Sequence, residues 1–490
     1  MKVAFVSSEV FPFAKTGGLA DVAGSLPKEL AKIGCEVKVF MPKYYPVNEY
    51  KWGHEYVGEI GEFKVRVGGW DHPVHLFKGL LPGSNVEIYF IHHPHYFHRE
   101  KLYTNDWDED ERFILFQKAV IETLQRLNWA PDVINCNDWQ TGLMPLFIKD
   151  NYNWDRMFNN TATVFTIHNI GYQGRFGTET LKRAEIAGHH YYGSGNVNFE
   201  NSVSFMKAGI VFADVVSTVS ETYAKEITTP EFAHGLHDII RSRANDLYGI
   251  LNGIDYDEWN PEKDKLIPFN FSSKYLSNKL KNKKELCQRF NLPFNESIPV
   301  VGIVLRMAPQ KGFDIIEQTM PGLVNLDCQW TILGSGEWDY QEMFNSMHRQ
   351  FPNKAGVYIG YENKLAHLIE AGADIFLMPS HYEPCGLNQM YSLKYGTVPV
   401  VRKTGGLADT VQDWDEINSY GMDIGDGFSF EAYEGYAMEH ALKRAINYFH
   451  NKPVWRKIQS NGMNKDFTWL KSAEKYLELY ERAVWKRKGI

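Results

Sequence analysis

The sequence predicts an α/β protein with two similar domains in tandem and a helical segment at its C-terminal end. Short apolar runs alternate with amphipathic helical patterns along most of the 490 residues, and a polar, lysine-rich stretch interrupts this alternation near the middle. A chain of this length is too long for one hydrophobic core, which favours at least two domains.

The first half opens with a buried strand, KVAFVSS, and an amphipathic helix that ends at Gly34. Five apolar residues recur on one face of this helix: Leu19, Val22, Ala23, Leu26 and Leu30. Further strands are expected at 35–42, 86–93, 132–137, 162–169 and 215–220, with a helix at 111–124. The stretch between Tyr50 and Phe97 is less regular and indicates hairpins at one edge of the sheet.

The alternation resumes after LNGIDYDEWNP (251–261), where we place the domain boundary. Strands are then expected at 299–306, 329–336, 356–361, 374–380 and 398–403, and the chain is helical in pattern from Phe430 onward. The expected parts are an N-terminal domain, 1–255, a second domain, 256–465, and a C-terminal helix, 466–490, packed back on the first domain. A βα alternation of this kind predicts parallel sheets with helices on both faces, so each domain is Rossmann-like.

Composition excludes several classes of function. The net charge of −8 and the isoelectric point near 6.1 argue against non-specific nucleic-acid binding and against a basic membrane-surface helix. The N-terminal apolar run is short and contains Glu9, unlike a signal peptide, and no apolar run approaches the roughly 20 residues of a membrane span. The cysteines are scattered and odd in number, which favours a reducing compartment: Cys35, Cys136, Cys287, Cys328 and Cys385. We therefore expect a cytoplasmic protein.

One phrase occurs twice, as KTGGLADV at 15–22 and as KTGGLADT at 403–410. Each copy follows a strand and opens a helix. Two glycines let the backbone approach a ligand closely, and the N–H groups at a helix start suit phosphate. For a single copy, a tight strand-to-helix turn is the favoured interpretation. Its presence in both domains favours two binding pockets on a shared interdomain cleft.

Other polar residues follow the expected strands. Arg306 and Lys311 could clamp a diphosphate or form a solvated turn, and Glu383 could bind sugar hydroxyls or cap a helix. His168 and Asp138 come after strands of the first domain and are functional or structural candidates. Neither HExxH, GxSxG nor a carboxylate cluster with metal spacing occurs, so no metal is expected.

Seven motifs follow one another along the chain: KTGGLADV, HNIGYQG, TVSETYAKEITTPEF, LNGIDYDEWNP, RMAPQKG, EPCGL and KTGGLADTV. This is the order found in bacterial glycogen synthases and plant starch synthases, and the chain resembles this family from Met1 to about Tyr480. The resemblance implies the GT-B architecture of two Rossmann-like domains around a cleft. It also implies retaining transfer of glucose from ADP-glucose to the non-reducing end of an α-1,4-glucan such as glycogen, without a cofactor.

The resemblance implies roles for individual residues. Lys15 would contact the nucleotide diphosphate and Gly18 would allow its close approach. Arg306 and Lys311 would bind the leaving diphosphate, and Glu383 would hold the donor glucose.

Further roles concern the adenine, the acceptor and the loop behind Glu383. Tyr361 would stack on the adenine, and His168 and Asp138 would lie on the acceptor-facing wall. The remaining implied binding residues are Cys385, Gly386, Leu387, Gly405 and Gly406.

Three positions bear on how closely the family pattern is followed. Gln140 replaces a usual His and Asn388 a usual Thr, whereas Tyr391, where related retaining transferases carry a second Glu, is usual in this family. The alternatives are a UDP-glucose-dependent GT-B enzyme and a catalytically silent nucleotide- or glucan-binding protein. The silent protein is disfavoured because a protein that only binds has no need of a complete set of leaving-group contacts, and the chain retains Lys15, Arg306, Lys311 and Glu383. A dehydrogenase is disfavoured because GSGEW supplies only part of the dinucleotide fingerprint.

Overall fold

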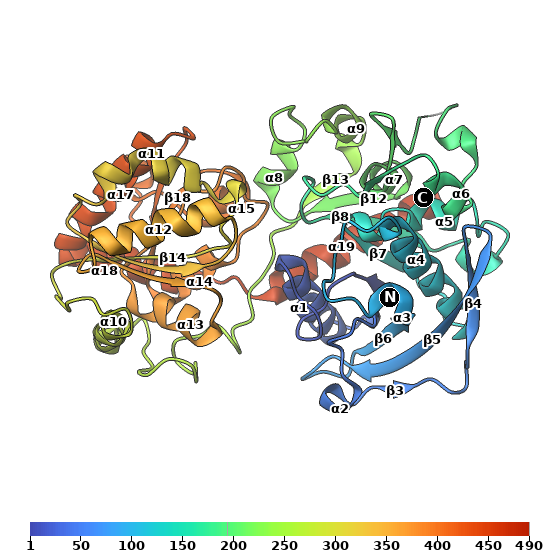
Figure 1. Ribbon diagram of the computed structural model, residues 1–490, viewed down its shortest axis with the longest axis horizontal. Coiled ribbons are helices and arrows are strands. Elements are labelled where there is room, and N and C mark those ends of the chain that lie inside the picture. The colour runs from blue at the N-terminus through green and yellow to red at the C-terminus, as the bar shows by residue number, and fades with distance from the viewer. Residues whose placement is uncertain (194, 490) are drawn as a thin grey trace. The chain divides into compact units, whose positions relative to one another are not determined.

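We describe the protein from a computed structural model that covers residues 1–193 and 195–489 (Figure 1). The chain forms two compact units: unit 1 is Met1–Gly253 with Trp469–Ile490, and unit 2 is Ile254–Thr468. The chain thus leaves unit 1 two residues before the boundary expected from the sequence, and it returns three residues after the expected one. Figure 1 colours unit 1 blue to green with a red helix, and unit 2 yellow-green to orange-red.

Unit 1 is built on a mainly parallel sheet. In the described residues its order is β13-β12-β8-β7-β1-β2-β6-β5-β3, with β4 paired to β5. The strands β3, β4 and β5 pair antiparallel, in agreement with the hairpins expected at this edge. The bounds are β1 (Lys2–Val6), β2 (Glu36–Pro42), β3 (Glu55–Tyr56), β4 (Phe63–Val67), β5 (Trp70–Leu80), β6 (Glu87–His92), β7 (Val133–Asn137), β8 (Ala162–Ile167), β12 (Val215–Thr218) and β13 (Leu247–Gly249).

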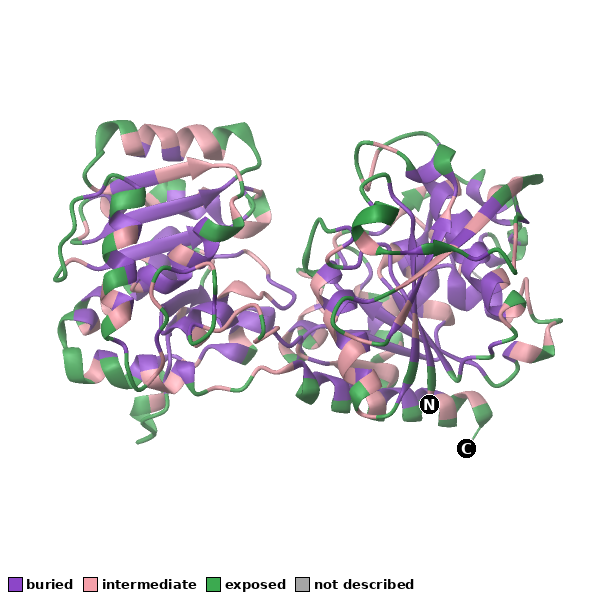
Figure 2. Ribbon diagram, turned by 90° about the horizontal axis from the view of Figure 1, so that it is seen from below, coloured by how far each residue is buried: buried purple, intermediate pink, exposed green. Residues whose placement is uncertain are grey.

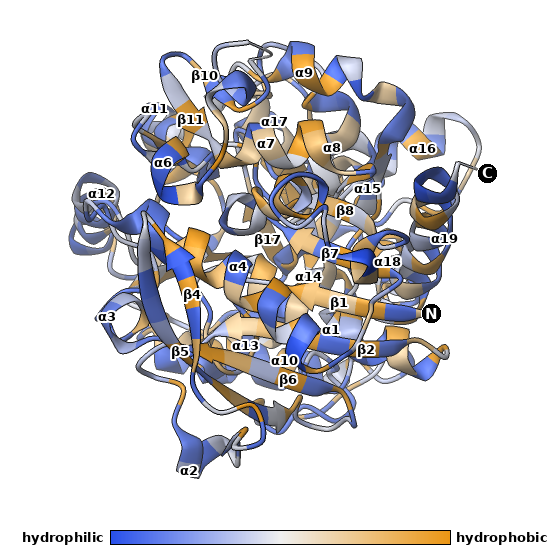
Figure 3. Cartoon of the chain, turned by 90° about the vertical axis from the view of Figure 1, so that its right-hand side faces the viewer, coloured by the Kyte–Doolittle hydropathy of each residue, from blue (hydrophilic) through white to orange (hydrophobic). Residues whose placement is uncertain are grey.

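The burial of these strands follows from their place in the sheet. Every residue of β7, VINCN, is buried, because a central parallel strand is covered on both faces. In contrast, β4 alternates between buried and exposed residues, and Figure 3 shows the matching alternation of hydrophobic and hydrophilic positions.

Helices cover the sheet of unit 1. The helices α1 and α19 pack against each other, and α19 contacts β7, β8 and β12, while α4 contacts β2 and β6. On α19, the Tyr480 hydroxyl donates to Asn135 Oδ1 over 2.6 Å. The longer helices are α1 (Gly18–Lys32), α4 (Glu109–Arg126), α7 (Phe205–Phe212) and α19 (Trp469–Lys488). The shorter elements are α2 (Glu49–Trp52), α3 (Pro94–Phe97), α5 (Met144–Lys149), α6 (Thr180–Ala184), α8 (Glu221–Glu226), α9 (His237–Ser242), β9 (Arg175–Phe176), β10 (Asn198–Phe199) and β11 (Ser202–Ser204).

Unit 2 has a parallel sheet in the order β16-β15-β14-β17-β18-β19. The strands are β14 (Val300–Val304), β15 (Gln329–Gly334), β16 (Ala355–Ile359), β17 (Ile375–Met378), β18 (Val398–Arg402) and β19 (Phe428–Phe430). The helices are α10 (Ser277–Arg289), α11 (Phe313–Leu323), α12 (Trp338–Gln350), α13 (Asn363–Gly372), α14 (Asn388–Tyr395), α15 (Gly405–Thr410), α16 (Trp414–Ser419), α17 (Gly435–His450) and α18 (Lys452–Met463). The expected continuous helical region after Phe430 is divided into α17, α18 and α19.

Each unit has its own hydrophobic core. Figure 2 shows buried strands inside each unit and exposed residues on the outer sides of the helices. The five residues expected on the buried face of α1 are all buried there. Among the described residues, no helix has the length and apolar character that crossing a membrane would require.

Candidate active site

The first copy of the repeated phrase ends the loop after β1 and forms the beginning of α1. A Cβ built on Gly17 or Gly18 would meet nothing within 4 Å, so the protein itself leaves open space at these glycines. Lys15 is 45% exposed, and its ammonium group lies 2.6 Å from Asp21 Oδ1. Burial raises the pKa of Asp21, and its contact with Lys15 opposes this rise. The turn therefore combines an accessible backbone with a lysine close to its surface.

The start of α1 has N–H groups of two kinds. The N–H groups of Thr16 and Gly17 donate to the carboxylate of Glu9. Those of Gly18 and Leu19 have no acceptor in the described part of the chain. Free N–H groups at the start of a fifteen-residue helix can bind an anion.

Asp138 and His168 follow the adjacent strands β7 and β8 and are joined by hydrogen bonds. Asp138 Oδ1 accepts from the N–H of His168 over 2.7 Å and from the N–H of Asn169 over 3.3 Å. Asn137 Nδ2 donates to the Val6 carbonyl, so Asn137 Oδ1 faces His168 Nε2 at 2.9 Å. His168 therefore carries its proton on Nε2, and Nδ1 is an acceptor.

Burial controls the charge of these two residues. It lowers the pKa of His168 to about 3, so the imidazole is neutral near pH 7. It raises the pKa of Asp138 to about 7, although the N–H groups of His168 and Asn169 oppose this shift. A neutral imidazole next to a hydrogen-bonded carboxyl group can orient sugar hydroxyls.

In unit 2, the structure brings Lys311 and Glu383 together. Lys311 follows β14 and Glu383 follows β17, and their Nζ and Oε2 atoms are 2.6 Å apart. The Ser380 hydroxyl donates to the same oxygen over 3.0 Å. Glu383 is only 6% exposed. Arg306 also follows β14 and is exposed. The carboxyl edge of this sheet thus carries two cations and one buried carboxylate, and this is the edge at which open α/β sheets bind ligands.

The second copy of the phrase packs against the loop that carries Glu383. A Cβ on Gly405, which has φ +44°, would lie 2.0 Å from the Glu383 carbonyl oxygen, and one on Gly406 would lie 2.1 Å from that of Cys385. The N–H of Gly406 donates to the carbonyls of Glu383 and Pro384, over 3.1 and 3.2 Å. The N–H of Gly406 is therefore engaged within the protein.

The other candidates lie around this loop. Tyr361 follows β16 and is 71% exposed, and its hydroxyl donates to Asn363. Cys385 is buried, and Gly386 and Leu387 lead into α14.

The three positions noted in the sequence have distinct surroundings. Asn388 Nδ2 donates to the Val304 carbonyl, which ties α14 to β14. The ring of Tyr391 stacks on Trp259 with centroids 3.9 Å apart. Gln140 is buried, and its Oε1 has no hydrogen-bond partner among the described residues.

Several residues were missed by sequence reasoning: Glu9, Asp21, Asn137 and Ser380. Asp21 lies inside the first phrase, Asn137 precedes Asp138, and Glu9 and Ser380 follow the ends of β1 and β17. Position relative to a strand end was therefore a usable signal, but their hydrogen-bond partners became visible only in the folded chain.

Comparison with known proteins identifies the family. Residues 2–242 match the starch synthase catalytic domain, and residues 286–461 match glycosyl transferases group 1. A glycogen synthase of Thermotoga maritima is 44% identical over 489 residues, covering 99% of both chains. A glycogen synthase of Streptococcus agalactiae is 42% identical over 483 residues, covering 98% of this chain and 100% of that one.

A solved structure agrees with this assignment. It is the catalytic domain of starch synthase IV from Arabidopsis thaliana bound to ADP and acarbose, with a TM-score of 0.91, 32% identity and coverage of 98% of this chain and 99% of that chain. A sucrose-phosphate synthase from Thermosynechococcus elongatus, 17% identical with a TM-score of 0.57, shares the fold. The chain therefore belongs to the glycogen synthase and starch synthase family and is a glycosyltransferase of the GT-B fold.

Proposed function

We propose that the protein transfers glucose from ADP-glucose to the non-reducing end of an α-1,4-glucan with retention of configuration. The observation that carries the proposal is the ion pair between Lys311 and the buried carboxylate of Glu383. It joins a group suited to sugar hydroxyls to a cation suited to a diphosphate. The Arabidopsis relative, which was solved with ADP and acarbose, supports both ligand classes.

The proposed chemistry is same-face substitution at the anomeric carbon. The bond from C1 to the diphosphate oxygen breaks, and its electron pair leaves with the diphosphate. The acceptor hydroxyl oxygen bonds to C1, and its proton passes to a diphosphate oxygen. Lys15, Arg306 and Lys311 stabilise the charge that develops on the leaving group. The ammonium group of Lys311 donates a hydrogen bond to the carboxylate of Glu383. This contact supports the proposal that Glu383 holds the donor glucose and is not the nucleophile that attacks C1.

The other residues complete the proposed binding sites. Asp138 and His168 contact the acceptor side, where hydrogen bonds to Asn137 and to backbone groups fix both of them. The exposed ring of Tyr361 provides a surface for the adenine. Backbone groups around Gly18 and in the Cys385–Leu387 turn approach the phosphates. A reducing compartment, the cytoplasm, is supported by five free, buried cysteines.

We expect ADP-glucose to be used in preference to UDP-glucose, because the flat ring of Tyr361 stacks more extensively on a purine than on a pyrimidine. Nucleotide release and polymer growth should be measured with each donor separately in the presence of glycogen. Equal or faster turnover with UDP-glucose would contradict the donor assignment. Absence of transfer from either donor would support a silent binding protein.

Activity is expected to survive exhaustive treatment with EDTA, because lysine and arginine side chains supply the positive charge at the leaving group. The initial rate should be compared before and after chelation and after addition of Mg²⁺ or Mn²⁺. Loss of activity that a divalent cation restores would show that the leaving group needs a metal.

A further inference from the structure

The carboxylate of Glu9 is buried between β1 and the first copy of the repeated phrase. Glu9 is only 3% exposed. Its Oε2 accepts from the N–H of Thr16 and, over 3.2 Å, from that of Gly17. Its Oε1 accepts from the hydroxyl of Thr16 over 2.6 Å. Glu9 thus caps the turn before α1, where the N-cap residue, Gly17, has no side chain to do so.

Tyr103 supplies the fourth hydrogen bond to this carboxylate. Its hydroxyl donates to Glu9 Oε1 over 2.6 Å and lies 2.8 Å from the hydroxyl of Ser8. No lysine, arginine or histidine of residues 1–193 and 195–489 forms an ion pair with Glu9. A buried charge is costly unless hydrogen bonds satisfy it, so the carboxylate and its four donors hold one another in place.

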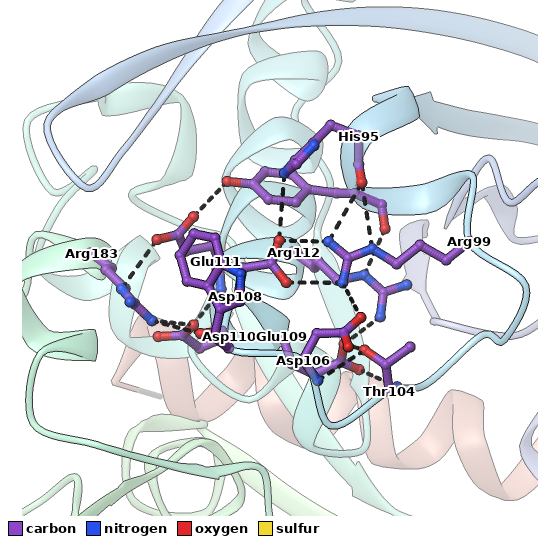
Figure 4. Close-up of polar contacts among 12 residues, drawn as sticks. His95, Arg99, Thr104, Asp106, Asp108, Glu109, Asp110, Glu111, Arg112 and Arg183 are labelled. Carbon is purple, nitrogen blue, oxygen red and sulfur yellow. Dashed lines mark hydrogen bonds and ion pairs between the residues drawn. The ribbon is translucent and has the colours of Figure 1, made fainter.

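A polar network at the start of α4 holds the segment that contains Tyr103, and Figure 4 shows three members of this network, Thr104, Glu109 and Arg112. Arg112 donates to the carbonyl of Leu102, which precedes Tyr103, over 3.0 Å. Glu109 accepts from the N–H and the hydroxyl of Thr104, which follows Tyr103, over 3.1 and 2.6 Å. Arg112 also forms an ion pair with Glu109. The backbone on both sides of Tyr103 is therefore tied to the start of α4.

We propose that Glu9, held by Tyr103, is a positioning residue that sets the Lys15–Gly18 turn for the donor diphosphate. By occupying the N–H groups of Thr16 and Gly17, Glu9 leaves those of Gly18 and Leu19 to face a ligand. It also fixes the residue directly after Lys15. The inference rests on the proposed function for its ligand, but the hydrogen bonds themselves can be tested without turnover.

The test uses full-length variants Glu9→Gln and Tyr103→Phe, with Tyr96→Phe as the matched control. The Tyr96 hydroxyl donates to Glu111 over 2.8 Å within the same network and forms no hydrogen bond with Glu9 in the described part of the chain. In Glu9→Gln we expect kcat/KM for ADP-glucose to fall about ten- to a hundredfold, because misplacing a binding group is costly. The KM for glycogen should stay within about twofold, and ADP should bind more weakly.

Hydrogen–deuterium exchange gives the readout that does not depend on activity. The peptide containing Thr16 and Gly17 should exchange faster in Glu9→Gln and in Tyr103→Phe than in the unmodified protein. In Tyr96→Phe, the same peptide should exchange at the rate of the unmodified protein. Unchanged exchange in Glu9→Gln, or a parallel change of KM for donor and glycogen, would overturn the proposal. If Glu9→Gln does not fold, the exchange rate of Tyr103→Phe tests the proposal instead. A change in exchange no larger than that of Tyr96→Phe would then overturn the proposal. If the unmodified protein fails to use ADP-glucose, the proposed function fails while exchange still tests the role of Glu9.

Discussion

Replacing Glu383 with Gln is expected to lower kcat by about two orders of magnitude or more while the protein stays folded. Glutamine keeps the size of the side chain but removes the charge that pairs with Lys311 Nζ at 2.6 Å. It also changes the oxygen that accepts from Ser380 into part of a neutral amide. In a buried site, such a loss weakens the hold on the donor glucose and leaves Lys311 without its partner.

Steady-state kinetics on the variant, with a thermal melt alongside, check this expectation. Glu416→Gln is the matched control, since Glu416 also pairs with a lysine, Lys403, but on the exposed surface. A surface pair contributes little, so the control should keep nearly full activity. A Glu383→Gln rate within a few-fold of the unmodified protein would show that Glu383 only caps the start of a helix.

The fold could be predicted because its signals are local. Apolar runs such as that of β17, IFLM, are buried along their whole length, and the helical period of α1 places its apolar residues in the core. The short strand β19 was missed because three residues are too few to show the alternation of apolar and polar positions that indicates a strand. The breaks between α17, α18 and α19 were also missed, because the helical pattern continues on both sides of each break.

The site was only partly predictable, because identical residues have different surroundings in the two units. The glycines of the first phrase face open space, whereas those of the second lie against the backbone of Glu383 and Cys385. Seven identical residues therefore gave the same expectation for two different turns. Contacts across the fold, such as the one from Tyr103 to Glu9, leave no trace in local spacing.

The two lysines of the repeated phrase should differ strongly when each is replaced by alanine. Lys15 belongs to the open turn at the start of α1, and we propose that it contacts the diphosphate. Losing a charge-assisted hydrogen bond costs about 1.5–3 kcal/mol, which corresponds to a roughly ten- to hundredfold loss of kcat/KM for the donor. Lys15→Ala should show at least this loss.

Lys403→Ala should stay within about threefold of the unmodified protein, the range of a solvated charge. Lys403 directly follows β18 and lies 2.9 Å from Glu416 and 3.5 Å from Glu431, and the hydrogen bond to Glu416 raises the pKa of Lys403. Both lysines pair with a carboxylate, since Lys15 contacts Asp21. Loss of an ion pair alone would therefore affect both variants alike, and only a contact with the donor separates them. Equal large losses would mean that both phrases bind phosphate through their lysines, whereas an unaffected Lys15→Ala would reduce the first phrase to a turn.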